Sequence, residues 1–255
     1  MEILYGSLIF VLGAILGSFF NVCIYRIPRN ESIVYPASHC SNCKKEIKKY
    51  DLIPIISYLI VKGKCRNCGE KISYQYILVE LITAIIFTFL YLKYGFSVKF
   101  FAYCFLASFL IITSLIDINT RYIYESLSYI GFTGAVLYMI YNYTVYGEIK
   151  TYILGGLITG GVIAILALLK VMGWGDIEVI LICGLFLGIK LSLVMLFLSF
   201  IVGGIIGIII LLSGKRNKDG YTPMAFAPCI ALGCVISIFY GENIIRWFIE
   251  YYGAI

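Results

Sequence analysis

Four cysteines in one basic segment have the type and spacing of metal ligands. They lie in two copies of the pattern Cys-x-Asn-Cys-x-x-x-Ile, which contain Cys40, Cys43, Cys65 and Cys68. Four thiolates in paired Cys-x-x-Cys turns are typical of a tetrahedral structural zinc site. The segment 26–76 is also too short to bury a large core, and domains of this size usually need a metal or a disulfide. The sequence therefore predicts zinc here.

The alternative for these cysteines is a pair of disulfides or free thiols. Disulfides rarely persist in the cytoplasm, where the charge pattern described below places this segment. His39, the only histidine of the chain, is interpreted as an ordinary loop residue, because four cysteines already complete the coordination shell.

Two aspartates at the edges of apolar stretches have the chemistry of an acid–base pair. Asp117 lies at the end of one stretch and Asp176 at the start of another, while Glu80 lies just inside a third. Ionisable groups are costly near a bilayer core, so each is a functional candidate. Two adjacent carboxyl groups share a proton, and one can activate water while the other acts as an acid. This is sufficient for peptide hydrolysis without a metal. The alternative is that each aspartate only caps a helix.

The surroundings of the two aspartates lead to two further expectations. Asp117 is expected at a helix C-terminus and Asp176 at a helix N-terminus, and the helix dipole therefore predicts that the shared proton resides mainly on Asp117. Gly173 and Gly175, which precede Asp176, permit close backbone approach and are the candidate substrate-binding residues.

The composition is that of a membrane protein. Of the 255 residues, 61% are hydrophobic and only 13% are charged, which soluble domains rarely show. Apolar stretches long enough to cross a bilayer recur along the chain. The expected spans are Leu4–Ile24, Ile77–Leu92, Phe100–Ile116, Leu127–Tyr143, Ile153–Val171, Ile177–Ile189, Leu191–Leu212 and Met224–Tyr240. The sequence thus predicts an all-α polytopic membrane protein with about eight transmembrane helices and a small zinc domain between the first two.

Four regions follow from these spans. We expect a first transmembrane helix over 1–25, a zinc-binding domain with four cysteine ligands over 26–76, a membrane core over 77–240 and an interfacial tail over 241–255. With the zinc domain placed in the cytoplasm, fifteen of the 20 Lys and Arg residues face inward, as the positive-inside rule requires. Both termini then lie outside. The net charge of +6 is attributed to this topology and to contact with anionic lipid, and no nucleic-acid partner is expected.

The residues identified so far resemble those of the type IV prepilin peptidases, bacterial leader peptidases of the intramembrane aspartyl type. The resemblance covers most of the chain: it includes 17–28, 36–40, 51–59, 63–66 and 78–81, and Gly173-Trp174-Gly175-Asp176 matches the family's Gly-x-Gly-Asp signature. It implies that Asp117 and Asp176 are catalytic. It also implies cleavage of a short charged leader after a glycine, at the cytoplasmic face of the bacterial inner membrane. The implied partners are prepilins, or pseudopilins of competence and type II secretion systems.

For members that carry the knuckle domain, the resemblance further implies methylation of the new N-terminus with S-adenosylmethionine. No residue of the chain is assigned to that cofactor, although Asn21, Arg26 and Glu80 are polar candidates.

Three positions depart from the family pattern. Glu178 stands where members often have Lys. Ile123 is followed by Tyr124-Glu125, where a Pro is common. The usual Pro-Phe-Gly-Pro-like run is replaced by Met-Ala-Phe-Ala-Pro at residues 224–228. The alternatives are a peptidase without methyltransferase activity, a non-enzymatic zinc-containing assembly factor, and a transporter with a proton relay.

Overall fold

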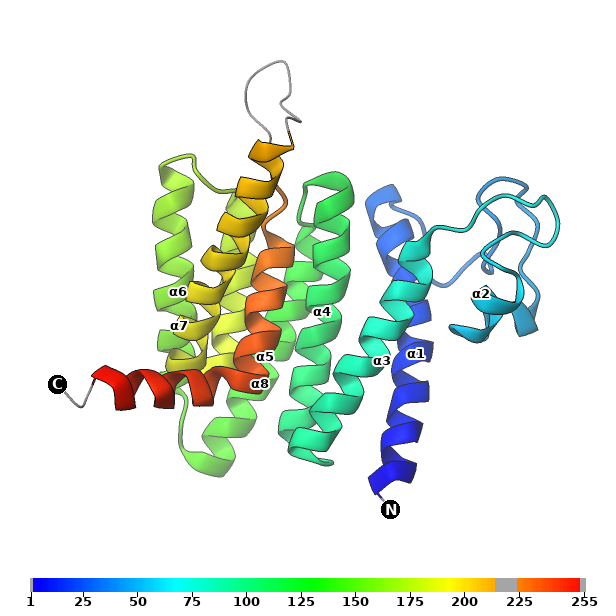
Figure 1. Ribbon diagram of the computed structural model, residues 1–255. Coiled ribbons are helices and arrows are strands. Elements are labelled where there is room, and N and C mark those ends of the chain that lie inside the picture. Colours follow the sequence, from blue (N-terminus) through cyan, green and yellow to red (C-terminus); the bar gives the residue numbers. More distant parts are fainter. Residues whose placement is uncertain (1, 214–223, 253–255) are drawn as a thin grey trace. The chain divides into compact units, whose positions relative to one another are not determined.

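The computed structural model describes residues 2–213 and 224–252, which form α-helices joined by short connections and contain no β-strand (Figure 1). The helices in this part of the chain are α1 (Glu2–Arg26), α2 (Ile56–Ile60), α3 (Tyr74–Tyr94), α4 (Val98–Thr120), α5 (Glu125–Tyr146), α6 (Lys150–Leu168), α7 (Trp174–Leu212) and α8 (Ala227–Tyr252). The chain divides into two compact units, residues 1–112 and 113–255.

In the first unit, small residues bring α1 and α3 into backbone contact. A Cβ atom added at Gly13 would lie 2.7 Å from the Cα atom of Ala84, and one added at Gly17 would lie 2.7 Å from that of Glu80. Small residues allow such close approach between helices in lipid. The connection from α1 to α3 contains the cysteine knuckles, two short 3-10 turns (Ile27–Arg29 and Lys49–Leu52) and the five-residue helix α2.

In the second unit, α7 reverses its direction at Gly188. The backbone of this residue has φ 71° and ψ 174°, a non-helical conformation that favours glycine. Gly160 of α6 lies against Leu181, and Gly155 lies against Gly188. The first half of α7 therefore runs antiparallel to α6. The sequence prediction of two separate segments, 177–189 and 191–212, is confirmed by this break.

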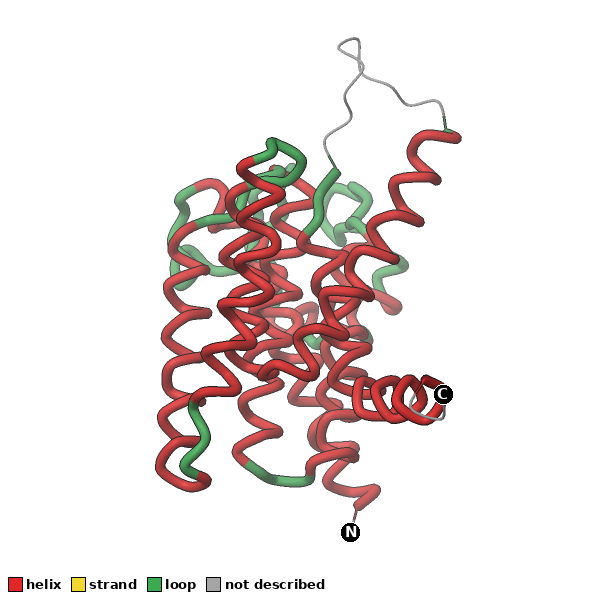
Figure 2. The backbone as a smooth tube through the Cα atoms, turned by 90° about the vertical axis from the view of Figure 1, so that its left-hand side faces the viewer, coloured by secondary structure: helices red, strands yellow, loops and turns green. Residues whose placement is uncertain are grey.

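The second half of α7 packs against α8. Gly241 lies against Leu191, and the Ser237 hydroxyl donates a hydrogen bond of 2.6 Å to the Leu191 carbonyl. At the other end, the Phe226 ring lies against Gly203. The second half of α7 thus returns toward the end of the unit at which α7 and α8 begin. After the return, the last part of α8 turns crosswise (Figures 1 and 2).

Six helices of the described part are long and apolar enough to cross a membrane: α1, α3, α4, α6, α7 and α8. The tyrosine-rich α5 has 22 residues and is not among the six. The all-helical membrane fold is confirmed, and the two halves of α7 account for two of the eight expected spans. The predicted region boundaries at residues 25, 76 and 240 stay predictions. The basic connector that contains Lys215, Arg216 and Lys218, and the last residues of the tail, lie outside the described residues.

Candidate active site and cysteine cluster

Asp117 lies in the last turn of α4 and points toward the start of α8. Its side chain is buried, and its Oδ2 atom accepts a hydrogen bond of 3.1 Å from the backbone N–H of Ala227. Ala227 is the first residue of α8, where backbone N–H groups have no partner within the helix. Pro228 follows at a position where helices tolerate proline. The segment before α8 thus supplies a donor to Asp117.

Asp176 is the third residue of α7 and is also buried. Its Oδ2 atom accepts a hydrogen bond of 3.2 Å from the backbone N–H of Gly173, the N-cap residue. Gly175 lies so close to Ile123 that an added Cβ atom would be 2.9 Å from the Ile123 Cβ atom. Gly175 therefore has a packing role, while the prediction that Gly173 and Gly175 bind substrate stays a prediction.

The two aspartates converge within the second unit. Their carboxyl groups interact electrostatically, and both interact with the Cys229 thiol. Each carboxyl group accepts a backbone hydrogen bond at a helix N-terminus. This arrangement brings two buried acids together in a region largely withdrawn from solvent, as a pair that shares a proton requires.

The N-terminus of α8 affects which aspartate is expected to hold the shared proton. The prediction from the sequence placed the proton on Asp117, because it took into account only the C-terminal end of α4 and the N-terminal end of α7. Because Asp117 also receives a hydrogen bond from a helix N-terminus, the dipole no longer distinguishes the two acids. The assignment of the proton to Asp117 therefore has no support from helix position.

Two contributors near the pair were not recognised as functional from the sequence. Cys229, interpreted there as a packing residue, is fully buried beside the aspartates. The Ala227 N–H group comes from the run 224–228, which was noted only as a departure from the family pattern. A backbone donor has no side-chain signature, and the position of that run was the only available signal.

In the first unit, the four knuckle cysteines come together. Their sulfur atoms all lie within 4.8 Å of one another, and the Cys40 and Cys68 sulfurs are 3.8 Å apart. Four sulfurs bound tetrahedrally to zinc at about 2.3 Å would be about 3.8 Å apart. All nine cysteines are free of disulfides, and His39 is not part of the cluster. The geometry fits a zinc-binding domain.

The two knuckles are built alike. Cys40 N–H donates to the Lys45 carbonyl and Cys65 N–H donates to that of Glu70, at 3.0 and 2.8 Å. The residues four positions after each first cysteine, Lys44 and Gly69, both have positive φ values of 58° and 73°. The repeated sequence pattern therefore produces a repeated turn that aims both pairs of thiols at one point.

Two thiols of the cluster differ in acidity. Backbone N–H groups of Cys68 and Asn67 lower the pKa of the Cys65 thiol to about 7. The pKa of the Cys68 thiol is raised to about 11: the Glu70 N–H group acts to lower it, but burial and the other thiols outweigh that effect. Four adjacent thiolates repel one another, and a dication would remove that repulsion.

Glu80 lies in the first unit and anchors the knuckle segment. Its buried Oε2 atom accepts a hydrogen bond of 2.7 Å from the backbone N–H of Ile55, whose φ is 61°. Arg26, also buried, donates to the carbonyls of Ser32 and Pro36 at 2.8 and 2.7 Å. These contacts tie the segment to α1 and α3, and the suggestion that Arg26 or Glu80 contributes to cofactor binding stays a prediction.

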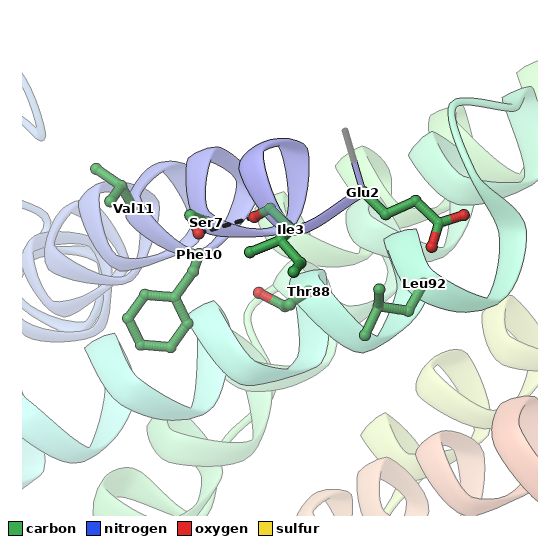
Figure 3. A pocket seen from close by; sticks show the side chains of 8 residues that line it. Glu2, Ile3, Ser7, Phe10, Val11, Thr88 and Leu92 are labelled. Carbon is green, nitrogen blue, oxygen red and sulfur yellow. Dashed lines mark hydrogen bonds between the residues drawn. The ribbon is translucent and has the colours of Figure 1, made fainter.

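The two hollows described here do not fit a site for S-adenosylmethionine. The larger, about 550 Å³, lies between α1 and α3 and is lined mainly by apolar side chains with Glu2, Ser7 and Thr88 at intervals (Figure 3). The smaller, about 200 Å³, is below the roughly 300–1,000 Å³ of pockets for drug-sized ligands. The larger lacks the convergent polar groups that a nucleoside and an amino-acid group require, and the smaller has polar lining but too little volume for such a ligand.

The fold and these two clusters define a multi-pass helical membrane protein with a buried carboxyl pair and a cysteine-knuckle domain. Residues 11–94 match the bacterial peptidase A24 N-terminal domain, and residues 104–208 match the type IV leader peptidase family. The chain belongs to this family, as its motifs suggested.

Characterised relatives are similar over almost the whole chain. A prepilin leader peptidase/N-methyltransferase of Bacillus subtilis is 33% identical over 246 residues, which cover 96% of this chain and 98% of the relative. Proteins of the same name from Pseudomonas aeruginosa and Neisseria gonorrhoeae are 28% and 29% identical; the matches cover 95% and 87% of this chain and 93% and 86% of those relatives. No solved structure matches.

Proposed function

We propose that this protein is a membrane-embedded aspartic peptidase that removes the leader peptide of type IV prepilins or pseudopilins. The observation that carries the proposal is the convergence of Asp117 and Asp176, both buried and each held by a backbone N–H group. Membership of the type IV leader peptidase family and the names of the relatives support the substrate class.

The geometry supports a division of labour between the two acids. One carboxylate takes a proton from a water molecule as the water oxygen attacks the scissile carbonyl carbon, and the protonated partner donates to the carbonyl oxygen. A proton then passes to the leaving nitrogen as the C–N bond breaks. The hydrogen bonds from Ala227 and Gly173 hold the Oδ2 atom of each carboxyl group in place. We assign Gly173 and Gly175 to the path of the substrate backbone beside Asp176.

We further propose that the protein methylates the new N-terminal amine. The names of the relatives carry this second activity, and S-adenosylmethionine is the methyl donor it implies, with no residue assigned to it. Zinc at Cys40, Cys43, Cys65 and Cys68 has a structural role, because four thiolates leave no open position for water.

The proposed location is the bacterial inner membrane, with the cysteine domain in the cytoplasm and both termini outside. The excess of Lys and Arg on one side of the expected topology supports this orientation. Anionic lipids are the proposed partners of the same basic segments.

The experiment is to incubate purified protein with a prepilin and labelled S-adenosylmethionine and to record cleavage and methyl transfer in one mass spectrum. Asp117→Asn and Asp176→Asn should each lower the cleavage rate by roughly 10²–10⁴-fold, the contribution typical of an acid–base group. Asp51→Asn is the matched control, because it makes the same substitution in the first unit, where Asp51 pairs with Arg66 and is no part of the candidate active site.

Near-normal cleavage by both active-site variants would eliminate the proposal, and pilus assembly by the double variant would favour an assembly factor instead. Cleavage without methyl transfer by the unmodified protein would identify a peptidase alone.

A further inference from the structure

A small acidic hollow lies between α5 and the first half of α7. It has a volume of about 200 Å³ and is lined by Glu125, Ser128, Tyr129, Phe132 and Glu178. All five residues belong to the second unit. One of its two carboxyl groups, Glu178, stands at a position where family members often have Lys, and the other, Glu125, follows Tyr124, which stands where a Pro is common.

The Ser128 hydroxyl is a buried polar group that a ligand in this hollow would satisfy. Ser128 is 3% exposed, and its Oγ atom has no hydrogen-bond partner among the described residues. A serine in a helix commonly donates to the carbonyl four residues earlier. Here that carbonyl, of Tyr124, already accepts the backbone N–H groups of Leu127 and Ser128. A buried hydroxyl without a partner is costly, and a donor or acceptor entering the hollow would satisfy it.

The lining favours a basic side chain as the ligand. Within residues 2–213 and 224–252, no ion pair joins Glu125 or Glu178 to a cation. The two carboxylates therefore present uncompensated negative charge, and Tyr129 and Phe132 offer aromatic rings for the stem and head of a Lys or Arg. A hard divalent cation needs about six oxygen ligands, and in the described chain only the knuckle cysteines form a group of three or more metal-binding side chains.

The hollow is placed to contact a peptide cut at Asp176. Residues two positions apart on a helix do not face each other, so Glu178 and Asp176 lie on different sides of α7. A helix with its side chains is about 10–12 Å wide, and an extended peptide advances about 3.3–3.6 Å per residue. A chain that passes the N-terminal end of α7 would span this distance with about three residues.

We propose that Glu125, Glu178 and the Ser128 hydroxyl form a specificity subsite for a Lys or Arg side chain of the substrate, about three residues from the scissile bond. This inference rests on the proposed peptidase function. It assigns to this chain a preference for a basic leader that the catalytic acids alone do not provide.

The test compares substrates that differ in one residue. A prepilin segment carrying Lys, or instead Gln, at each of the five positions before the scissile bond is cleaved by detergent-purified protein, and kcat/KM is measured by mass spectrometry. The unmodified protein should prefer Lys by about tenfold at one position, as expected for a charge-assisted hydrogen bond. In the double variant Glu125→Gln/Glu178→Gln, that ratio should fall to about one, whereas Glu148→Gln, a control at an exposed loop of the same unit, should keep it.

A charge reversal at both carboxylates distinguishes loss of the subsite from a folding defect. Glu125→Lys/Glu178→Lys should prefer a substrate with Glu at the same position over one with Lys, which a merely unstable protein cannot do. A Lys-to-Gln ratio that stays at about ten in the double variant, or the lack of a positional preference in the unmodified protein, would overturn the subsite while leaving the peptidase intact. Failure to cleave any of the substrates would instead contradict the proposed function.

Discussion

At the scale of single residues, the candidate site combines side chains that the sequence displays with backbone donors that it does not. Asp117 and Asp176 stand out because charged residues are rare at the edges of apolar spans. The donor to Asp117 comes from Ala227, 110 residues away, and nothing in the type of that residue marks it. A sequence therefore identifies the acids, whereas the groups that orient them emerge only from the tertiary fold.

The contribution of that donor can be isolated with proline. Ala227→Pro removes the backbone N–H group at a position where a helix tolerates proline. We expect cleavage to slow by about 10–100-fold, because hydrogen bonds to charged groups contribute about 1.5–3 kcal/mol. Ala227→Gly keeps the N–H group and should retain most of the activity. Equal rates for the two variants, measured on the same prepilin, would mean that the donor is dispensable.

At the scale of secondary-structure elements, more of the structure could be predicted from the sequence than at the scale of single residues. Hydrophobic stretches located the membrane helices, and the break expected between residues 189 and 191 corresponds to the reversal at Gly188. The sequence did not predict which helices pair closely. Repeated glycines indicated close packing in general, but the partners of each pair follow from three-dimensional contacts. Gly184, for example, lies against the backbone of both Gly155 and Gly156.

This contact provides a stability prediction. A Cβ atom at Gly184 would lie 2.6 Å from the Gly156 Cα atom, and backbone cannot move aside as a flexible side chain can. Gly184→Ala should therefore destabilise the protein by about 1–3 kcal/mol, the usual effect of overpacking. Gly161→Ala is the matched control, because nothing lies within 4 Å of its added Cβ atom. Thermal unfolding in detergent measures both, and a Gly184→Ala variant as stable as the control would contradict this packing.

The knuckle element gives a second prediction. Cys43→Ser leaves three thiolates, so zinc affinity should fall by more than the roughly 10–100-fold seen when an outer-shell group is lost. We expect limited proteolysis to cut the segment 29–73 faster and methyl transfer to suffer more than leader cleavage. Ser41→Ala, in the same turn but outside the cluster, should behave as the unmodified protein. Metal analysis that finds no zinc in the native protein would remove this prediction.

At the scale of the whole molecule, composition and charge were the informative quantities. The hydrophobic content predicted a multi-pass membrane protein, and six helices of the described chain have the necessary length and composition. The distribution of Lys and Arg predicts an orientation, which is a property of the protein in its bilayer.

Labelling with a membrane-impermeant maleimide measures that orientation. Glu148 and Lys170 are exposed residues in connections at opposite ends of α6. In intact cells, Glu148→Cys should react and Lys170→Cys should not, because the positive-inside rule places Lys170 in the cytoplasm. Lys170→Cys should react once the cells are opened, and the unmodified protein serves as the background control. The reverse pattern would invert the topology.

Asp117 lies three residues before the end of α4, and Asp176 is the third residue of α7. Hydrolysis at that depth needs no long channel to deliver water, since the aqueous boundary is within a turn or two of the acids. Cleavage at this depth would also separate the two products, the leader and the remaining chain, because they differ in polarity. In the proposed orientation, a polar leader released there would diffuse into the cell interior, whereas an apolar remainder would stay dissolved in lipid, ready for extraction by an assembly machine.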